Sequence, residues 1–277
     1  MGFKIFILCL RQVLNNWKMA FRLSWFWILA MVFAYVVIFS FSFYLATVLG
    51  SSGRLQVPFW LLMIVVPLIA VPAMISGTVV AIGWHRFVLR EEIPDSFYVL
   101  HRGWPLGRYI WNSLKIGLII SLLAIAILYV FSLLAPEFMV PGWGMKLSAV
   151  RRMSVAQLVI SLVIFQPIIG IVFVWVFLRM GLVFPAIAVG KKLSLRDSFR
   201  LTDAIAGPLV ITAISMILFQ FIPKFLDLLL TASLGSGTFL TTLVMPLVTL
   251  VFAWFSFFIG FGVLTVVYGH LVENRPI

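Results

Sequence analysis

Long apolar runs separated by short polar blocks make up most of the chain. Each run is about 20 residues or longer, enough for a helix to cross a hydrocarbon core of roughly 30 Å with its backbone hydrogen bonds satisfied. The pattern therefore predicts an all-α, polytopic membrane protein, a single integral membrane domain that forms a bundle of six transmembrane helices. The six predicted spans lie at about residues 23–49, 58–84, 112–134, 155–177, 208–230 and 239–268.

Composition supports this class and narrows the partners. The 277 residues are 64% hydrophobic and 10% charged, whereas roughly a quarter of the residues of a soluble domain are charged. The net charge of +12 comes from cations in short loops beside apolar helices, where anionic lipid headgroups are nearer than nucleic acid. A single cysteine, Cys9, excludes an internal disulfide and a cysteine-based metal cluster. We expect membrane lipids as partners, and no nucleic acid, metal or cofactor.

The first 22 residues have a helical periodicity of their own, with cations on one side and apolar residues on the other. This predicts an amphipathic helix in the membrane interface, with its cations toward lipid phosphate. An ordinary positively charged lead-in to the first span explains the same pattern. Because a cation interrupts the apolar run and no cleavage site follows, we expect the segment to be retained. The cations are Lys4, Arg11, Lys18 and Arg22, and the apolar side comprises Phe3, Phe6, Ile7, Leu10, Leu14, Trp17 and Phe21.

Lysine and arginine divide unequally between alternate loops. Fifteen lie in the N-terminal segment, in the polar blocks that include Arg86 and Arg179, and in the tail; four lie in the loops of Arg54 and Lys146. Short cytoplasmic loops carry the excess of Lys and Arg. The count predicts that both termini and both polar blocks face the cytoplasm.

The two polar blocks share the tripeptide Asp-Ser-Phe, at residues 95–97 and 197–199. With a proline in each even-numbered span, this spacing predicts three repeated helical hairpins, with short cytoplasmic interfacial helices after the second and fourth spans. A chance recurrence of one tripeptide is the alternative. Ser194 followed by Asp197 matches a capping box at the start of the second short helix. The prolines are Pro67, Pro167 and Pro246.

The second polar block also carries a cluster of cations beside an apolar helical side. Attraction to anionic lipid contributes about 1 kcal/mol per cation near the membrane surface. We therefore predict lipid contact here as well as along the N-terminal segment. The cations of this cluster are Lys191, Lys192, Arg196 and Arg200.

Small residues recur every fourth position in the second span, at Ala73, Gly77 and Ala81. Small side chains let another helix approach closely. We interpret the three positions as helix packing, with a substrate role as the alternative.

Lys224 and Asp227 are an acid and a base three residues apart beside an apolar run. Ionisable residues at membrane depth indicate a function such as a proton or ion relay. If the fifth span ends at Pro223, the two residues instead form a salt bridge at the outer interface, which is the interpretation we favour.

Catalytic and metal-binding patterns are not evident. His85, His101 and His270 lie at predicted inner helix ends and lack the spacing of metal ligands, so we interpret them as interfacial histidines. The sequence has no nucleophile elbow and no phosphate-cradling glycine loop. We expect no enzymatic activity.

Three stretches carry a family resemblance: WHRFVLREE from Trp84, RYIWNSLKIGLI from Arg108 and FPAIAVGKKLSLRDSFRLT from Phe184. With them the chain resembles a group of uncharacterised six-span bacterial inner-membrane proteins, which are distantly similar to the membrane domain of some glycerophosphodiester phosphodiesterases. The catalytic domain of those enzymes has no counterpart here, so their activity does not carry over. The resemblance implies the bacterial inner membrane as location and leaves the function open.

Two functions therefore stand. The first is a non-enzymatic membrane scaffold or envelope-associated protein. The alternative is a small-molecule, lipid or ion transporter with a cavity at the proline-kinked even-numbered helices, which requires a polar cavity near the midplane. A protein partner or a homo-oligomer stays open in both.

Overall fold

The computed structural model describes residues 1–44, 59–93, 105–134, 166–235 and 238–276. Within these ranges it contains helices and no strand, and six segments are long and apolar enough to cross a membrane. The predicted all-α, six-span bundle is thereby confirmed. The spans are formed by α2 (Trp17–Tyr44), α3 (Phe59–Arg90), α4 (Leu106–Leu134), α7 (Gln166–Met180) with α8 (Val183–Ala188), α10 (Ala206–Leu234) and α11 (Met245–Glu273).

Shorter elements join or precede these spans. Helix α1 (Gly2–Asn15) opens the chain, α9 (Leu195–Leu201) and a 3₁₀ turn (Asp203–Ile205) precede α10, and a π-helical turn (Leu240–Val244) leads into α11. The chain bends at Asn16, so residues 17–22 belong to the first span and not to the predicted interfacial segment. Several predictions fall outside the described residues: Arg54, the first Asp-Ser-Phe tripeptide, His101, Lys146 and the start of the fourth span at residue 155.

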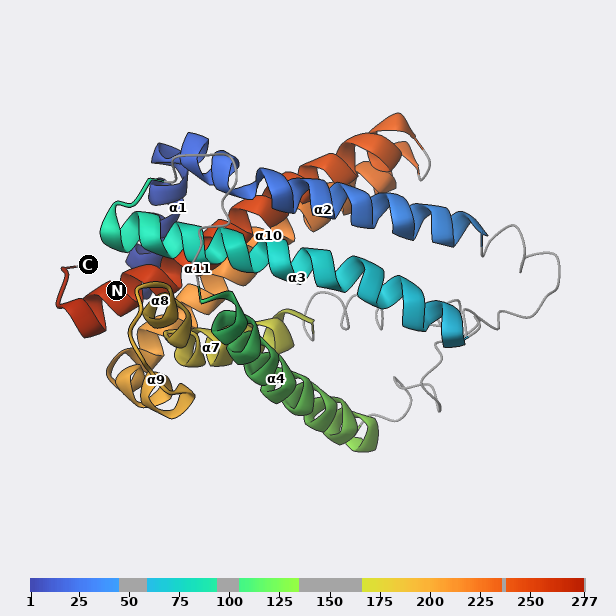
Figure 1. Cartoon of the computed structure of the whole chain (residues 1–277). Coiled ribbons are helices and arrows are strands. Elements are labelled where there is room, and N and C mark those ends of the chain that lie inside the picture. Colours follow the sequence, from blue (N-terminus) through green and yellow to red (C-terminus); the bar gives the residue numbers. More distant parts are fainter. Residues whose placement is uncertain (45–58, 94–104, 135–165, 236–237, 277) are drawn as a thin grey trace.

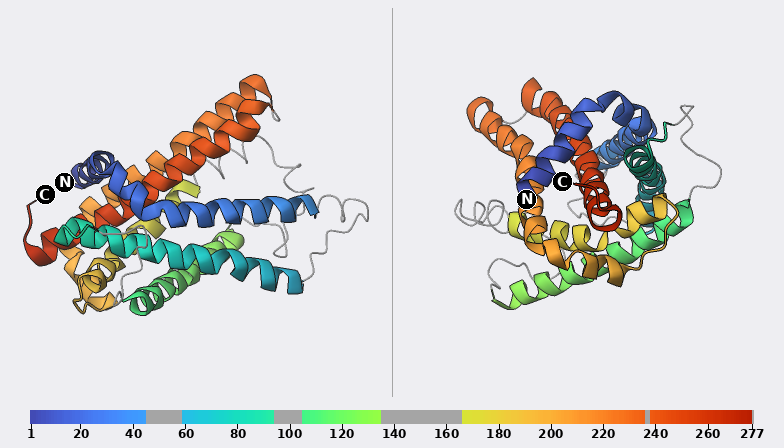
Figure 2. Two further views of the ribbon diagram at one scale, coloured as in Figure 1. Left: turned by 45° about the horizontal axis from the view of Figure 1, so that its top comes forward. Right: turned by 90° about the vertical axis from the view of Figure 1, so that its left-hand side faces the viewer.

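Both termini lie at the same end of the bundle, and the long helices separate as they run away from it (Figure 1; Figure 2). Side chains near the termini are buried, such as Trp84, Leu209 and Val267, each at most 1% exposed. Toward the other end, apolar side chains such as Met63 and Leu247 are more than half exposed. We call the region around Trp84, Leu209 and Val267 the packed end. The opposite end of the bundle consists of helices with exposed apolar side chains, which is typical of helices surrounded by lipid chains.

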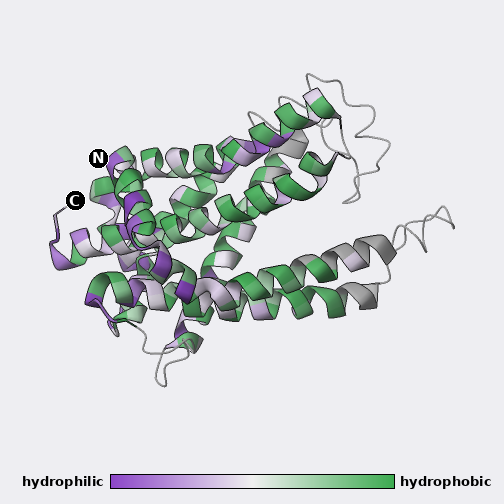
Figure 3. Ribbon diagram, turned by 90° about the horizontal axis from the view of Figure 1, so that it is seen from above, coloured by the Kyte–Doolittle hydropathy of each residue, from purple (hydrophilic) through white to green (hydrophobic). Residues whose placement is uncertain are grey.

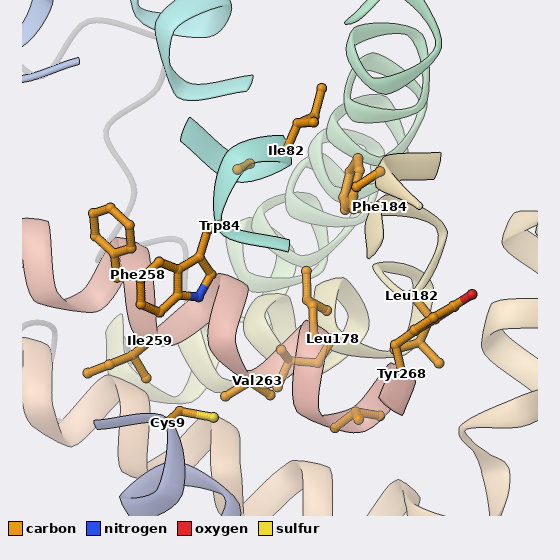
Figure 4. Packing of buried hydrophobic residues seen from close by; sticks show 14 of the residues in the cluster. Cys9, Ile82, Trp84, Leu178, Leu182, Phe184, Phe258, Ile259, Val263 and Tyr268 are labelled. Carbon is orange, nitrogen blue, oxygen red and sulfur yellow. The ribbon is translucent and has the colours of Figure 1, made fainter. Parts of the chain in front are cut away.

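Helix α1 packs against α10 and α11 at the packed end. Ile5, Cys9 and Val13 are fully buried, and Figure 4 shows Cys9 directed at α11. The Thr212 hydroxyl on α10 donates to the Gly2 carbonyl over 3.1 Å. The helix therefore has an apolar side that packs against protein. The sequence interpretation did not distinguish this side from the apolar side that it predicted to face the membrane. Four residues of the predicted side, Phe3, Leu14, Trp17 and Phe21, are 49–60% exposed.

Helix α3 contacts α2, α4, α8 and α11. Gly77 lies beside Trp27 of α2 and Phe257 of α11, whose rings stack with centroids 4.6 Å apart. Ala81 is fully buried, and Ala73 is half-buried. The positions of these small residues fit the packing interpretation.

Candidate functional site: a basic pocket at the packed end

The turn between α8 and α9 forms the floor of the candidate site. Gly190 ends α8 with a φ of +82°, a conformation that favours glycine because it has no Cβ. Ser194 then caps α9: its hydroxyl accepts from the Asp197 N–H over 3.1 Å and donates to the Asp197 carboxylate over 2.5 Å. The predicted cap at Ser194 is confirmed. We call residues 189–194 the α8–α9 loop.

A buried arginine holds α9 beneath the bundle. The Arg179 side chain on α7 is 6% exposed. It donates to the Phe199 carbonyl over 2.8 Å, to the Thr202 hydroxyl over 3.3 Å and to the Asp203 carboxylate. Its guanidinium also lies 3.6 Å from the centroid of the Phe199 ring, an arrangement favourable to a cation. These contacts fix the position of α9 relative to α7.

The break between α7 and α8 is satisfied by a side chain of α9. The buried Ser198 hydroxyl donates to the Arg179 carbonyl over 2.8 Å and accepts from the Leu182 N–H over 3.2 Å. Buried backbone groups without partners are costly. Ser198, part of the second Asp-Ser-Phe tripeptide, therefore stabilises the turn into α8.

Two arginines of α3 hold the end of α8 from the other side. Arg86 donates to the Ala188 carbonyl over 3.0 Å, and Arg90 donates to the Val189 carbonyl. Glu92 pairs with Arg86 at 2.6 Å and lies 3.6 Å from Arg90. The cations thus complement the carbonyl end of α8, and the α8–α9 loop is held by both α3 and α9.

Between the end of α3, the start of α4 and the α8–α9 loop lies a cavity of about 670 Å³. We call it the basic pocket. The three stretches that carry the family resemblance all contribute to its lining. The polar side chains at its walls include four cations, one amide and one carboxylate: Arg86, Arg108, Lys191, Lys192, Asn112 and Asp197.

The four cations differ in how far they are already neutralised. Arg86 has its ion pair with Glu92, and Lys191 lies 3.9 Å from the Glu273 carboxylate. Within the described ranges, the side chains of Arg108 and Lys192 have neither a hydrogen bond nor an ion pair. These two side chains give the pocket its uncompensated positive charge.

The predicted lipid-contact cations fall on separate surfaces. Lys191 and Lys192 line the basic pocket, whereas Arg196 and Arg200 are exposed on α9 and do not line it. On α1 and the start of α2, three of the four cations are exposed and Arg22 is half-buried. The exposed three are Lys4, Arg11 and Lys18.

Sequence reasoning missed Arg86 and Arg108 as site residues, although both were counted for topology. The one feature of the sequence that could have indicated a site role for them is their position in the stretches that carry the family resemblance. Contact between those stretches depends on long-range packing, which charge counting cannot supply.

Lys224 and Asp227 lie within α10, which continues through Pro223 to Leu234. The helix itself therefore does not end at Pro223. Both side chains are exposed, no ion pair joins these two described residues, and the Lys224 ammonium lies 5.0 Å from the Phe221 ring centroid. The relay interpretation stays a prediction.

His85 is buried, contrary to the interfacial interpretation. Its Nδ1 lies 2.7 Å from the Thr265 hydroxyl of α11, and its Nε2 lies 3.4 Å from the Tyr109 hydroxyl of α4. Partners 180 and 24 residues away along the chain cannot be read from local spacing. His270 lies nearer the surface, with Nδ1 2.9 Å from the Arg275 carbonyl.

The fold and the site together define an integral membrane protein: a six-span helical bundle with a basic pocket at its packed end. No protein-family model, curated protein or solved structure matches the chain. The family resemblance therefore stays a prediction.

Proposed function

We propose that the protein is a non-enzymatic scaffold of the bacterial inner membrane, whose packed end faces the cytoplasm and engages anionic lipid headgroups. The observation that carries this proposal is the gathering of hydrophilic residues at the packed end (Figure 3). Exposed cations such as Lys18, Lys192 and Arg196 lie there, beside apolar spans. Each cation near an anionic surface contributes about 1 kcal/mol to lipid attraction.

Exposed tryptophans support a headgroup location for this end. Trp17 is 55% exposed at the start of α2, and Trp111 is 59% exposed in the second turn of α4. Each has a lysine near its ring, with Lys18 at 5.9 Å and Lys115 at 5.4 Å from the centroid. Tryptophan is enriched where membrane helices meet the headgroups.

Two cavities in the described part of the chain bear on the transporter alternative. The basic pocket lies at the packed end, away from the middle of the spans. A groove of about 410 Å³ between α2 and α11 is lined by apolar and aromatic side chains, among them Phe21, Trp27 and Trp254. A transporter for a polar substrate needs polar groups near the midplane, and neither of these two cavities provides them.

The test replaces Lys191, Lys192, Arg196 and Arg200 together with glutamine. Because the attraction is electrostatic, we expect the variant to retain less anionic lipid through purification. Its melting temperature should fall in detergent supplemented with anionic lipid, and fall less in neutral lipid. Lipid phosphorus analysis and thermal unfolding measure the two effects. Equal losses in both lipids mean that the cations are structural and the lipid proposal is wrong.

A further inference from the structure

We propose that the basic pocket binds a phosphate ester, with Arg108 and Lys192 as its main phosphate contacts. The inference rests on the proposed function in one respect, that the packed end lies at the cytoplasmic leaflet. It goes further because it names one site and one ligand chemistry, whereas the scaffold proposal requires only attraction between a cationic surface and anionic lipid.

The size of the pocket fits a phosphate that carries a substituent. Its volume of about 670 Å³ lies within the range of roughly 300–1,000 Å³ found for small-molecule sites. A single phosphate ion fills only a small part of this space. The remainder has room for a glycerol-sized group or a lipid headgroup.

The charges at the pocket walls favour an anion with several oxygens. Arg108 and Lys192 come from different segments and have no partner among the described residues. Arginine provides a planar fork of donors that matches phosphate, and lysine provides a mobile point charge. Arg86 and Lys191 add positive charge, although each already has a carboxylate nearby.

The start of α4 adds to this attraction. Pro105 immediately precedes α4 and lines the pocket with Arg108 and Asn112 from its first two turns. The amino end of a helix carries a partial positive charge that favours anions. On the opposite side, the Asp197 carboxylate lines the pocket and accepts from the Ser194 hydroxyl in the cap of α9, so one negative charge stands against the four cations.

The walls of the pocket are held in place before any ligand binds. The Ala188 carbonyl is held by Arg86, the Val189 carbonyl by Arg90, and α9 by Arg179. Lys191 and Lys192 follow this fixed backbone after Gly190. Because the backbone of the site is already ordered, ligand binding loses less conformational entropy.

The same chemistry is offered by two sources, a phospholipid headgroup with a terminal phosphate and a soluble phosphate ester. The purified full-length protein in phosphatidylcholine nanodiscs distinguishes them. One arm titrates glycerol 3-phosphate and inorganic phosphate by calorimetry. The other measures retention of phosphatidic acid against phosphatidylcholine by mass spectrometry of the intact complex.

The variant Arg108→Gln with Lys192→Gln removes two charges from the pocket. The matched control, Arg196→Gln with Arg200→Gln, removes two exposed charges from α9 outside it. We expect the pocket variant to weaken binding at least tenfold and the control to change it by less than about twofold, because a charge-assisted contact contributes far more than distant attraction. The charge-conserving pair Arg108→Lys with Lys192→Arg should restore most of the binding.

Each outcome decides the proposal. Binding of glycerol 3-phosphate or of phosphatidic acid that is lost in the pocket variant and kept in the control supports it, and the one that binds identifies the source. Binding of inorganic phosphate alone, or binding kept in both variants, overturns it. Equal loss in both variants means diffuse attraction and overturns the site while leaving the scaffold proposal standing. Failure of all probes to bind the wild-type protein also overturns the site. If the double variant does not fold, the single substitutions Arg108→Gln and Lys192→Gln provide the same comparison.

Discussion

We expect the Gly262→Leu substitution to expose Cys9 and to raise its rate of labelling by a soluble maleimide roughly tenfold. A Cβ on Gly262 would lie 3.2 Å from the Cys9 Cβ, so the larger leucine side chain has no room while α1 stays docked. Overpacking destabilises the docked state of α1 by about 1–3 kcal/mol. A change of about 1.4 kcal/mol shifts the equilibrium between docked and undocked α1 tenfold. The chain has one cysteine, so labelling reports on Cys9 alone.

The chemistry of the thiol enlarges this difference. Burial raises the pKa of Cys9 above its ordinary value of 9.0, and only the thiolate reacts. Native labelling should therefore be slow at neutral pH. Because the folded-state pKa is raised, the protonated thiol favours the docked state fully below pH 9.0, and this contribution is lost as pH rises further. Labelling should accelerate above that pH in the wild-type protein.

A matched control for this measurement is Gly117→Leu on α4, where an added Cβ would have no atom within 4 Å apart from its own stretch of helix backbone and its chain neighbours. It should leave the labelling of Cys9 unchanged. If Cys9 in the wild-type protein already reacts as fast as in the unfolded chain, α1 does not pack against α11 and this part of the fold is wrong.

The second large effect is expected from Arg179→Ala, which should lower the free energy of unfolding by about 2–4 kcal/mol. The change removes the contacts with Phe199, Thr202 and Asp203 and leaves a gap beneath α9. Unfolding in mild detergent, followed by circular dichroism against added denaturing detergent, measures the loss. Arg179→Lys should be intermediate, because lysine keeps the charge and loses the planar fork.

The control for Arg179 is Arg200→Ala, an exposed arginine on α9 with no ion pair in the described structure. We expect a change within about 0.5 kcal/mol, as for ordinary surface substitutions. Similar losses in both variants would mean that the buried contacts of Arg179 do not hold α9.

Hydropathy was sufficient to predict the spans because a membrane helix must be apolar along about 20 residues. The cap at Ser194 was also predictable, since it depends on residues three apart. The buried side of α1 was not. Periodicity shows that Ile5, Cys9 and Val13 form an apolar side, yet it cannot tell whether lipid or protein covers that side, because both are apolar.

The basic pocket shows the same limit more strongly. Lys192 was predicted to contact lipid from local charge alone. Its neighbours across the pocket, Arg86 and Arg108, come from α3 and α4, and only the folded bundle brings them to one cavity. The burial of His85 likewise depends on Thr265, 180 residues away.

In the proposed topology, six spans place the cationic packed end in the cytoplasm, next to the anionic inner leaflet. Topology mapping in cells tests this placement. Paired reporters, one active only in the periplasm and one only in the cytoplasm, are fused after Arg54, Lys146, Asp197 and the C-terminus. We expect periplasmic signals at Arg54 and Lys146, and cytoplasmic signals at Asp197 and the C-terminus. A cytoplasmic signal at Lys146 or a periplasmic signal at Asp197 would contradict it.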